Sequence, residues 1–324
     1  MILFWYIFLD KKEDIMDLFG ERMKSYEQKA NLYLEKKIPV AIRLDGKAFH
    51  TFTKGLEKPF DKVLTTAMQK TMKALCEEIQ GCVFGYTQSD EITLILIDYQ
   101  NENTSAWFDY RIQKMCSIAA SIATKYFNQF FQLEAMAPLE QEIQECFDET
   151  IEEDYEEESD LPFILAEGED LGIEIHSIED EYVNCLMEKA NEGACFDARC
   201  FNVPKEEVCN LIYWRQTDAI RNSIQAVGQA IFSPKELQNK SCADIKQMLL
   251  SIEGAPLDWD NDIPIFLQRG TACFKEYVLE KVDTIKVENI IYPNVVLRSN
   301  WKLDYEMPIL KGENREYIEK LINF

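Results

Sequence analysis

The sequence predicts an α+β fold of ferredoxin-like type, in which a βαββαβ chain order builds an antiparallel sheet with helices on one face. Two observations predict it. Short apolar runs alternate with longer segments of helical spacing in the order strand, helix, strand, strand, helix, strand. The last strand-like run follows a long acidic stretch, and further helical segments follow it. We therefore expect this sheet to carry an acidic insertion and a mostly helical C-terminal part.

The first strand and helix are indicated by residues 38–79. Residues 38–44 (IPVAIRL) form an apolar run that ends at Asp45-Gly46, which predicts a buried strand meeting a turn. Apolar side chains in residues 59–79 recur at helical spacing, and Gly81 follows the last of them. A helix over this segment is the expectation.

The remaining sheet elements follow in order. Residues 83–86 and 92–97 read as strands around a tight turn that contains Asp90. The second of these runs is almost continuously apolar, as in a central strand. Residues 107–131 predict a long helix, and residues 194–203 (ACFDARCFNV) predict the closing strand.

The C-terminal part is predicted to be mostly helical. Helical spacing covers residues 206–232 and 241–252, and strand-like runs occur within residues 264–296. The polar end of the chain is expected to be peripheral.

Charge is distributed unevenly. The formal net charge is -24, but residues 134–192 hold 22 acidic residues and one lysine, so that the remaining chain carries -24 + 21 = -3. Phosphate binding depends on Lys and Arg, and a nearly neutral body can still present a basic face to nucleic acid. The acidic segment is either a solvated surface insertion or a partner or autoinhibitory site.

These patterns predict five segments. They are an N-terminal extension (1–15), the first part of the sheet domain (16–132), the acidic insertion (133–193), the final strand of that domain (194–203) and a C-terminal part (204–324).

The ten cysteines include no C-x-x-C pair, which favours reduced thiols in a cytoplasmic protein and makes a structural zinc site unexpected. The apolar residues 1–9 are too few for a membrane span, which needs about 20. They also lack a basic leader, so no membrane association is expected.

Two aspartates carry the predicted chemistry. Asp45 and Asp90 each lie at the end of an apolar strand, and the proposed sheet brings both to one edge. Two carboxylates with a backbone carbonyl and triphosphate oxygens suit Mg²⁺, and two such ions about 4 Å apart stabilise both oxygens of phosphoryl transfer. Taken singly, each aspartate is also compatible with an ordinary structural turn.

Seven motifs in order resemble those of the Thg1 family, tRNA-His guanylyltransferase and its relatives. They are RLDGKAFH (43–50), EKPFD (57–61), GYTQSDE (85–91), WFDYRIQK (107–114), FDAR (196–199), WRQTD (214–218) and RGT (269–271). The resemblance covers roughly residues 16–132 and 193–275.

The resemblance implies a polymerase-like palm domain in which Asp45 and Asp90, with the Gly46 carbonyl, bind two Mg²⁺ ions and catalyse the reaction. It implies nucleotide contacts, with GTP or ATP as substrates, at Asp45, Gly46, Lys47, Ala48, Phe49, His50, Lys58, Asp61, Ser89, Asp90, Arg111 and Lys114. It implies RNA contacts at Arg199, Arg215, Arg221 and Asn222. The residues 214 and 215 are equally compatible with helix packing.

The implied activity is addition of nucleotides to the 5′ end of tRNA in the 3′–5′ direction, by a homotetramer. Members dedicated to tRNA-His carry H-I-N-N where this chain has Ile220-Arg221-Asn222-Ser223. The R-N-S form resembles the template-directed repair enzymes of the family instead. A palm-type nucleotide cyclase or signalling-nucleotide synthase and a non-catalytic RNA-binding protein remain the alternatives.

Overall fold

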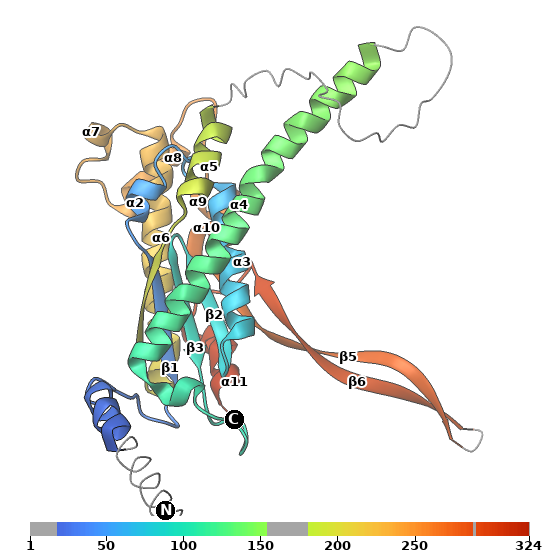
Figure 1. Cartoon of the computed structure of the whole chain (residues 1–324). Coiled ribbons are helices and arrows are strands. Elements are labelled where there is room, and N and C mark those ends of the chain that lie inside the picture. Colours follow the sequence, from blue (N-terminus) through green and yellow to red (C-terminus); the bar gives the residue numbers. More distant parts are fainter. Residues whose placement is uncertain (1–17, 154–180, 288–289, 324) are drawn as a thin grey trace, which may run out of the picture.

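A computed structural model describes residues 18–153, 181–287 and 290–323 (Figure 1). At its centre is an antiparallel sheet of six strands, in the order β4-β1-β3-β2-β5-β6. The strands are β1 (Val40–Gly46), β2 (Cys82–Gln88), β3 (Glu91–Leu96), β4 (Phe196–Asn202), β5 (Thr271–Val287) and β6 (Ile290–Asp304). The mixture of helices with an antiparallel sheet confirms the predicted fold class.

The chain order of the first part is β1, α3, β2, β3, α4, β4, with α3 spanning Lys62–Glu78 and α4 spanning Ile112–Glu153. Its strands lie in the order β4-β1-β3-β2. β1 is therefore a central strand with neighbours on both sides, paired with β3 and with β4.

The two faces of the sheet divide the side chains of β1 by alternation. Val40, Ile42 and Leu44 join the core under α3 and α4. Ala41 joins a second core under α6 (Lys205–Ile231) and α11 (Glu316–Ile322), and Arg43 and Asp45 follow it on that face. The two helices of the βαββαβ unit therefore share one face, as predicted, and helices of the C-terminal part cover the other face.

The residues on either side of helix α3 fix where it begins and ends. The Asp61 carboxylate accepts a hydrogen bond from the Leu64 N–H, which caps the helix start. After the helix, Gly81 has a φ of +82°, and a Cβ there would lie 2.8 Å from the Ile97 carbonyl oxygen. The chain can therefore turn into β2 only through glycine.

The second long helix differs from its prediction at both ends. A short 3₁₀ segment covers Trp107–Tyr110, in which Phe108 and Asp109 have φ values of 49° and 56°, so α4 begins only at Ile112. α4 then continues through residue 133, where the insertion was expected to begin, to residue 153. The chain returns as α5 (Glu181–Glu192), which buries Val183 and Leu186. Residues 1–15 and the central acidic residues 154–180 lie outside the described part.

Short helices surround the second half of α6. They are α7 (Pro234–Leu237), α8 (Cys242–Leu250), α9 (Trp259–Asp262) and α10 (Ile265–Arg269). At the end of the chain, a 3₁₀ turn (Gly312–Arg315) leads into α11. Ile318 and Ile322 of α11 are buried against the sheet, so the expectation of a peripheral chain end is wrong.

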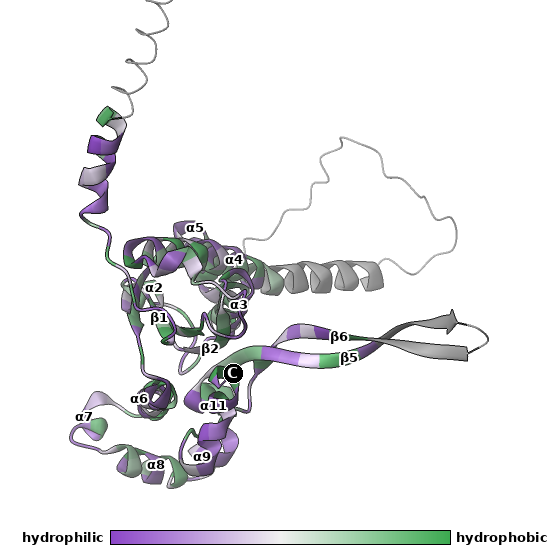
Figure 2. Ribbon diagram, turned by 90° about the horizontal axis from the view of Figure 1, so that it is seen from below, coloured by the Kyte–Doolittle hydropathy of each residue, from purple (hydrophilic) through white to green (hydrophobic). Residues whose placement is uncertain are grey.

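A two-stranded arm leaves the sheet. Only Thr271 to Phe274 of β5 pair with β2, while β5 and β6 pair with each other along their whole length. The arm extends well beyond the body of the protein (Figure 2) and exposes apolar side chains that include Tyr277, Leu279 and Leu297. Within the described residues, no helix has the length and apolarity that crossing a bilayer requires.

Candidate active site

Asp45 and Asp90 lie side by side at one end of the sheet. Asp45 is opposite Glu91 in the pairing of β1 with β3, and Asp90 lies in the turn between β2 and β3. The Gly46 N–H donates a hydrogen bond of 3.0 Å to the carbonyl oxygen of Asp90. The two backbones that carry the aspartates are therefore directly joined.

The electrostatics of this pair disfavour two bare negative charges. Burial, and then the nearby charge of Asp45, raise the pKa of Asp90, although hydrogen bonds from its own backbone and from Ser89 act in the opposite direction. A cation between the carboxylates would relieve this repulsion. Among the described residues, no group of three or more His, Cys, Asp or Glu side chains is placed to hold a metal. The available donors are two carboxylates and backbone carbonyls, which are oxygen ligands of the kind Mg²⁺ prefers.

The turn after Asp45 is tightly built. A Cβ on Gly46 would lie 2.2 Å from the Phe49 ring, so glycine is required there. Ala48 has a φ of 56° and precedes the short helix α2 (Phe49–Phe52). The Phe49 side chain is buried among Phe52, Phe127 and Phe196. Only its backbone is therefore available to a nucleotide.

The exposed part of this turn consists of Lys47, Ala48 and His50. The Lys47 N–H donates to the carbonyl oxygen of Cys195, which ties the turn to the start of β4. The Lys47 and His50 side chains thus project from a fixed backbone next to Asp45.

A pocket of about 330 Å³ opens beside the β2–β3 turn, between α3, α6 and α10. Four residues predicted to bind nucleotide or RNA line it, namely Lys58, Asp61, Ser89 and Asn222. Its volume is that of a small-ligand site. Ser89 is the neighbour of Asp90, so the pocket adjoins the aspartate pair.

Asp61 has less freedom than its sequence motif suggests. Its side chain is buried, and its carboxylate accepts hydrogen bonds from the N–H groups of Leu64 and Glu57 and from the Tyr182 hydroxyl, at 2.8, 3.1 and 2.9 Å. Two carboxylate oxygens can accept about four hydrogen bonds, so these three contacts use most of that capacity. Asp61 therefore shapes the pocket wall, whatever further contact it makes.

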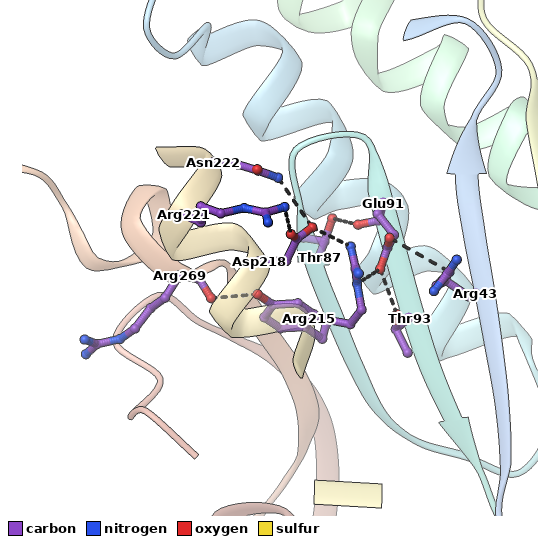
Figure 3. A network of polar contacts seen from close by, with 10 residues as sticks. Arg43, Thr87, Glu91, Thr93, Arg215, Asp218, Arg221, Asn222 and Arg269 are labelled. Carbon is purple, nitrogen blue, oxygen red and sulfur yellow. Dashed lines mark hydrogen bonds and ion pairs between the residues drawn. The ribbon is translucent and has the colours of Figure 1, made fainter. Parts of the chain in front are cut away.

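A polar network joins α6 to β1 and β3 of the sheet (Figure 3). The Arg215 Nε donates to Glu91 Oε1 at 2.6 Å, and its Nη2 lies 3.2 Å from Asp218 Oδ2. Arg43 Nε is 3.9 Å from Glu91 Oε2. Burial raises the pKa of Glu91, and the charges of Arg215 and Arg43 oppose that effect. Arg215 is buried in this network, so of its two predicted roles the structure favours helix packing over RNA contact.

The other predicted RNA contacts are at the surface. Arg221 is exposed and donates to Asp218 Oδ1 at 2.5 Å, and Asn222 reaches the same carboxylate at 3.5 Å. Arg199 is half-exposed and donates to Asp197 at 3.1 Å. These three residues remain accessible on the α6 side of the sheet.

Arg111 and Lys114 do not join the other predicted nucleotide contacts within the chain. Arg111 forms an isolated bridge with Tyr33 just before β1, and the Ile112 N–H donates to the carbonyl oxygen of Leu32. Asp45 lies at the other end of β1 from the Tyr33 segment. Figure 1 shows that α4, which starts beside Arg111 and contains Lys114, begins at the end of the sheet opposite to α2 and the turn after Asp45.

The sequence motifs did not single out several residues at the site. Arg43 could have been found from alternation, because it lies on the same face of β1 as Asp45. Gln69 donates to Thr271 at 2.9 Å in the pocket wall, a contact between residues far apart in the chain. Tyr182 belongs to the acidic segment and has no local signal that relates it to Asp61.

Comparison with known proteins gives consistent results. Residues 20–153 match the family model of tRNA-His guanylyltransferase, Thg1. A bacterial tRNA-His guanylyltransferase (Thg1)-like protein, solved in complex with ATP, is 30% identical, with a TM-score of 0.64 over 94% of this chain and 99% of that protein. A bacterial tRNA-His guanylyltransferase (Thg1)-like protein in complex with GTP gives a TM-score of 0.63 at the same identity and coverage.

A viral relative also aligns over most of the chain. The uncharacterised protein R259 of Acanthamoeba polyphaga mimivirus is 28% identical over 94% of this chain and 92% of its own length. At 30% identity, the similarity to the bacterial protein covers both chains almost completely. The chain therefore belongs to the Thg1 family of nucleotidyltransferases.

Proposed function

We propose that this enzyme is a magnesium-dependent tRNA nucleotidyltransferase that adds nucleotides to the 5′ end of its substrate in the 3′–5′ direction. The observation that carries the proposal is the direct backbone link between Gly46 and Asp90, which puts the two aspartates together. Membership of the Thg1 family supports the reaction class.

Asp45, Asp90 and the Gly46 carbonyl would hold two Mg²⁺ ions. When bound, these ions would neutralise charge on the triphosphate and on the attacking and leaving oxygens. The fit rests on the oxygen donor set and on the pKa of Asp90, which is raised by burial and then by the nearby charge of Asp45.

The nucleoside triphosphate would bind between the 45–50 turn and the neighbouring pocket. Lys47 and His50 project from the turn, while Lys58 and Ser89 line the pocket. Structures of a similar bacterial protein contain ATP and GTP, which makes both nucleotides reasonable substrates here. Arg111 and Lys114 would take part only if a second subunit brought its own sheet end to this site.

The proposed reaction has two phosphoryl-transfer steps. ATP or GTP first activates a 5′-monophosphate RNA end, with loss of pyrophosphate. The 3′-hydroxyl of the incoming nucleoside triphosphate then attacks that activated 5′ phosphate and displaces the activating nucleotide. Positioning and charge neutralisation supply most of the rate enhancement in such reactions, so no dedicated general base is required.

Template-directed repair of 5′-truncated tRNA is the preferred form of this activity. Where dedicated guanylyltransferases carry H-I-N-N, this chain has Ile220-Arg221-Asn222-Ser223. Asn222 lines the pocket and Arg221 is exposed beside it, so this segment is placed to influence how RNA and nucleotide are presented.

Residues 204–324 would provide RNA binding and self-association, the latter as a homotetramer. The exposed apolar side chains of the β5–β6 arm, with Leu279 directly opposite Leu297, supply a surface that a second copy of the chain would cover.

The test is incubation of the protein with 5′-truncated tRNAs and each labelled nucleoside triphosphate, with Mg²⁺ and after its removal by EDTA. We expect template-matched extension of the 5′ end that requires Mg²⁺ and is lost in Asp45→Ala and Asp90→Ala. Asp109→Asn, an exposed acid at the opposite end of the sheet, is the matched control and should retain activity. A free cyclic nucleotide product, or extension by both alanine variants, would overturn the proposal.

A further inference from the structure

Trp214 is an exposed indole with two arginines beside its ring. Its side chain is 54% exposed, whereas Trp107 and Trp259 are buried. The Arg215 guanidinium carbon lies 4.6 Å from the Trp214 ring centroid, and that of Arg43 lies 5.8 Å from it. Aromatic rings beside arginines are the recurring means by which proteins hold unpaired nucleotides.

Arg43 makes few polar contacts within the described protein, and its side chain remains 20% exposed. Its Nε is buried without a hydrogen-bond partner among the described residues. The nearest carboxylate, Glu91, lies 3.9 Å away and is engaged at 2.6 Å by Arg215. A guanidinium can donate five hydrogen bonds in a fork that fits phosphate.

A second arginine lies next to the first. Arg199 of β4 is directly opposite Arg43 in the register of β1 and β4, and its side chain is half-exposed. Arg43 is two residues before Asp45 on the same face, a separation of about 7 Å along a strand. The two arginines and the indole therefore form a surface immediately beside the aspartate pair.

We propose that Trp214, Arg43 and Arg199 form a stacking site for an unpaired nucleotide at the 5′ end of the RNA substrate. This inference rests on the proposed function. The indole stacks on the base while Arg43 and Arg199 contact the adjoining phosphates. The occupant is RNA rather than the free triphosphate, because none of these three residues lines the pocket assigned to the nucleotide.

The alternative is that the indole only covers the ion pair between Arg215 and Glu91. That role requires bulk above the ion pair and predicts no effect on RNA that is separate from an effect on stability. Two variants distinguish the two roles. Trp214→Leu keeps apolar bulk but has no aromatic ring on which a base could stack. Trp214→Phe keeps a smaller aromatic ring. Tyr26→Leu, at an exposed aromatic residue that precedes β1 and has no assigned role, is the control.

The experiment measures the Kd for a 5′-truncated tRNA by fluorescence anisotropy, the KM for the nucleoside triphosphate and the Tm of each full-length variant. We expect Trp214→Leu to weaken RNA binding roughly tenfold, in the range of base–aromatic stacking, with unchanged nucleotide KM and Tm. Trp214→Phe should lose less affinity, and RNA should quench the fluorescence of the wild type more than that of Trp214→Phe.

Two results would overturn the inference outright, and a third would replace it with the alternative role. One is an unchanged RNA Kd in Trp214→Leu while the wild type extends RNA normally, in which case the proposed function stands and the stacking site fails. The other is a wild type that neither binds nor extends RNA, in which case both fail. A drop in Tm with equal loss toward both substrates in Trp214→Leu, together with a fluorescence response unchanged in Trp214→Phe, would assign the indole to covering the ion pair.

Discussion

The hydroxyl of Tyr182 donates a hydrogen bond of 2.9 Å to Oδ2 of Asp61 and thereby links α5 to the wall of the candidate nucleotide pocket. The same oxygen accepts the Glu57 N–H, and the other carboxylate oxygen accepts the Leu64 N–H. One buried carboxylate thus joins α5, the loop that carries Lys58 and the start of α3. The helix that returns from the acidic segment is therefore part of the pocket's support.

Tyr182→Phe should loosen this wall. A hydrogen bond to a charged group contributes about 1.5–3 kcal/mol, so we expect a loss of roughly 1.5 kcal/mol in the free energy of unfolding. The KM for the nucleoside triphosphate should rise several-fold, with RNA affinity unchanged. Steady-state kinetics and urea unfolding measure both, with Tyr277→Phe as the control. An unchanged nucleotide KM would show that α5 does not support the pocket.

Asp90→Asn should lower activity without lowering the stability of the fold. Removing a half-buried charge beside Asp45 relieves repulsion and desolvation, so the Tm measured without Mg²⁺ should equal or exceed that of the wild type. Turnover should fall on the order of 10³-fold, because several kcal/mol of charge stabilisation are lost. Adding Mg²⁺ with nucleotide should raise the Tm of the wild type and leave that of Asp90→Asn almost unchanged. A clearly lower Tm for the variant would show that Asp90 has a structural role.

Two arginines on α6 should behave in opposite ways. Arg215→Ala leaves the buried Glu91 without its partner and should cost about 3 kcal/mol of stability. Arg221→Ala, at an exposed site, should change stability by less than about 0.5 kcal/mol and weaken RNA binding several-fold. Chemical denaturation and RNA titration at two salt concentrations test the pair. Equal stability of both variants would contradict the assignment of Arg215 to the interior network.

The arm should control self-association. Leu279 is 69% exposed and pairs across the hairpin with Leu297, which is 60% exposed. Leu279→Lys introduces charge into that surface and should shift the protein to smaller assemblies in light scattering without lowering the Tm of the subunit by more than a few degrees. Glu276→Gln, an exposed change nearer the sheet, is the control. Persistence of the full assembly in Leu279→Lys would exclude this part of the arm from the interface.

Stability should fall in alkaline solution. Burial, and then the hydrogen bond with Cys116, raise the pKa of Cys200 to about 12, and burial raises that of Tyr99 to about 12. The folded state therefore keeps protons that the unfolded chain loses nearer pH 9 and pH 10, so unfolding free energy declines as pH rises from about 9 towards 12. Urea unfolding under reducing conditions between pH 8 and pH 11 measures the decline. Cys200→Ala should reduce its slope, and an unchanged slope would contradict the role of this thiol.

The elements of the sheet could be predicted because their signals are local. The apolar run before Asp45 and the helical spacing of residues 59–79 correspond to β1 and α3 within a few residues. The start of α4 could not be predicted in this way, because Phe108 and Asp109 adopt left-handed conformations that their residue types do not indicate. Tertiary packing stabilises them there.

The site residues also differ in whether local sequence signals could predict them. Asp45 and Asp90 were predicted to converge from strand order, and the Gly46–Asp90 hydrogen bond supports that interpretation. The partners of Asp61 and Arg215 depend on contacts across more than a hundred residues of chain, which no motif encodes. Arg111 shows the converse, since a residue in a matching motif lies at the opposite end of the sheet.

The alternation of side chains along β1 restricts how this chain can change over evolution. Deleting or adding one residue before Asp45 would turn that carboxylate toward the apolar layer of α3 and α4, and would bring Leu44 or its neighbour to the catalytic side. Substitutions in β1 can be gradual, but changes of its length cannot. Natural variation in length should therefore fall elsewhere, in the segments that join the strands.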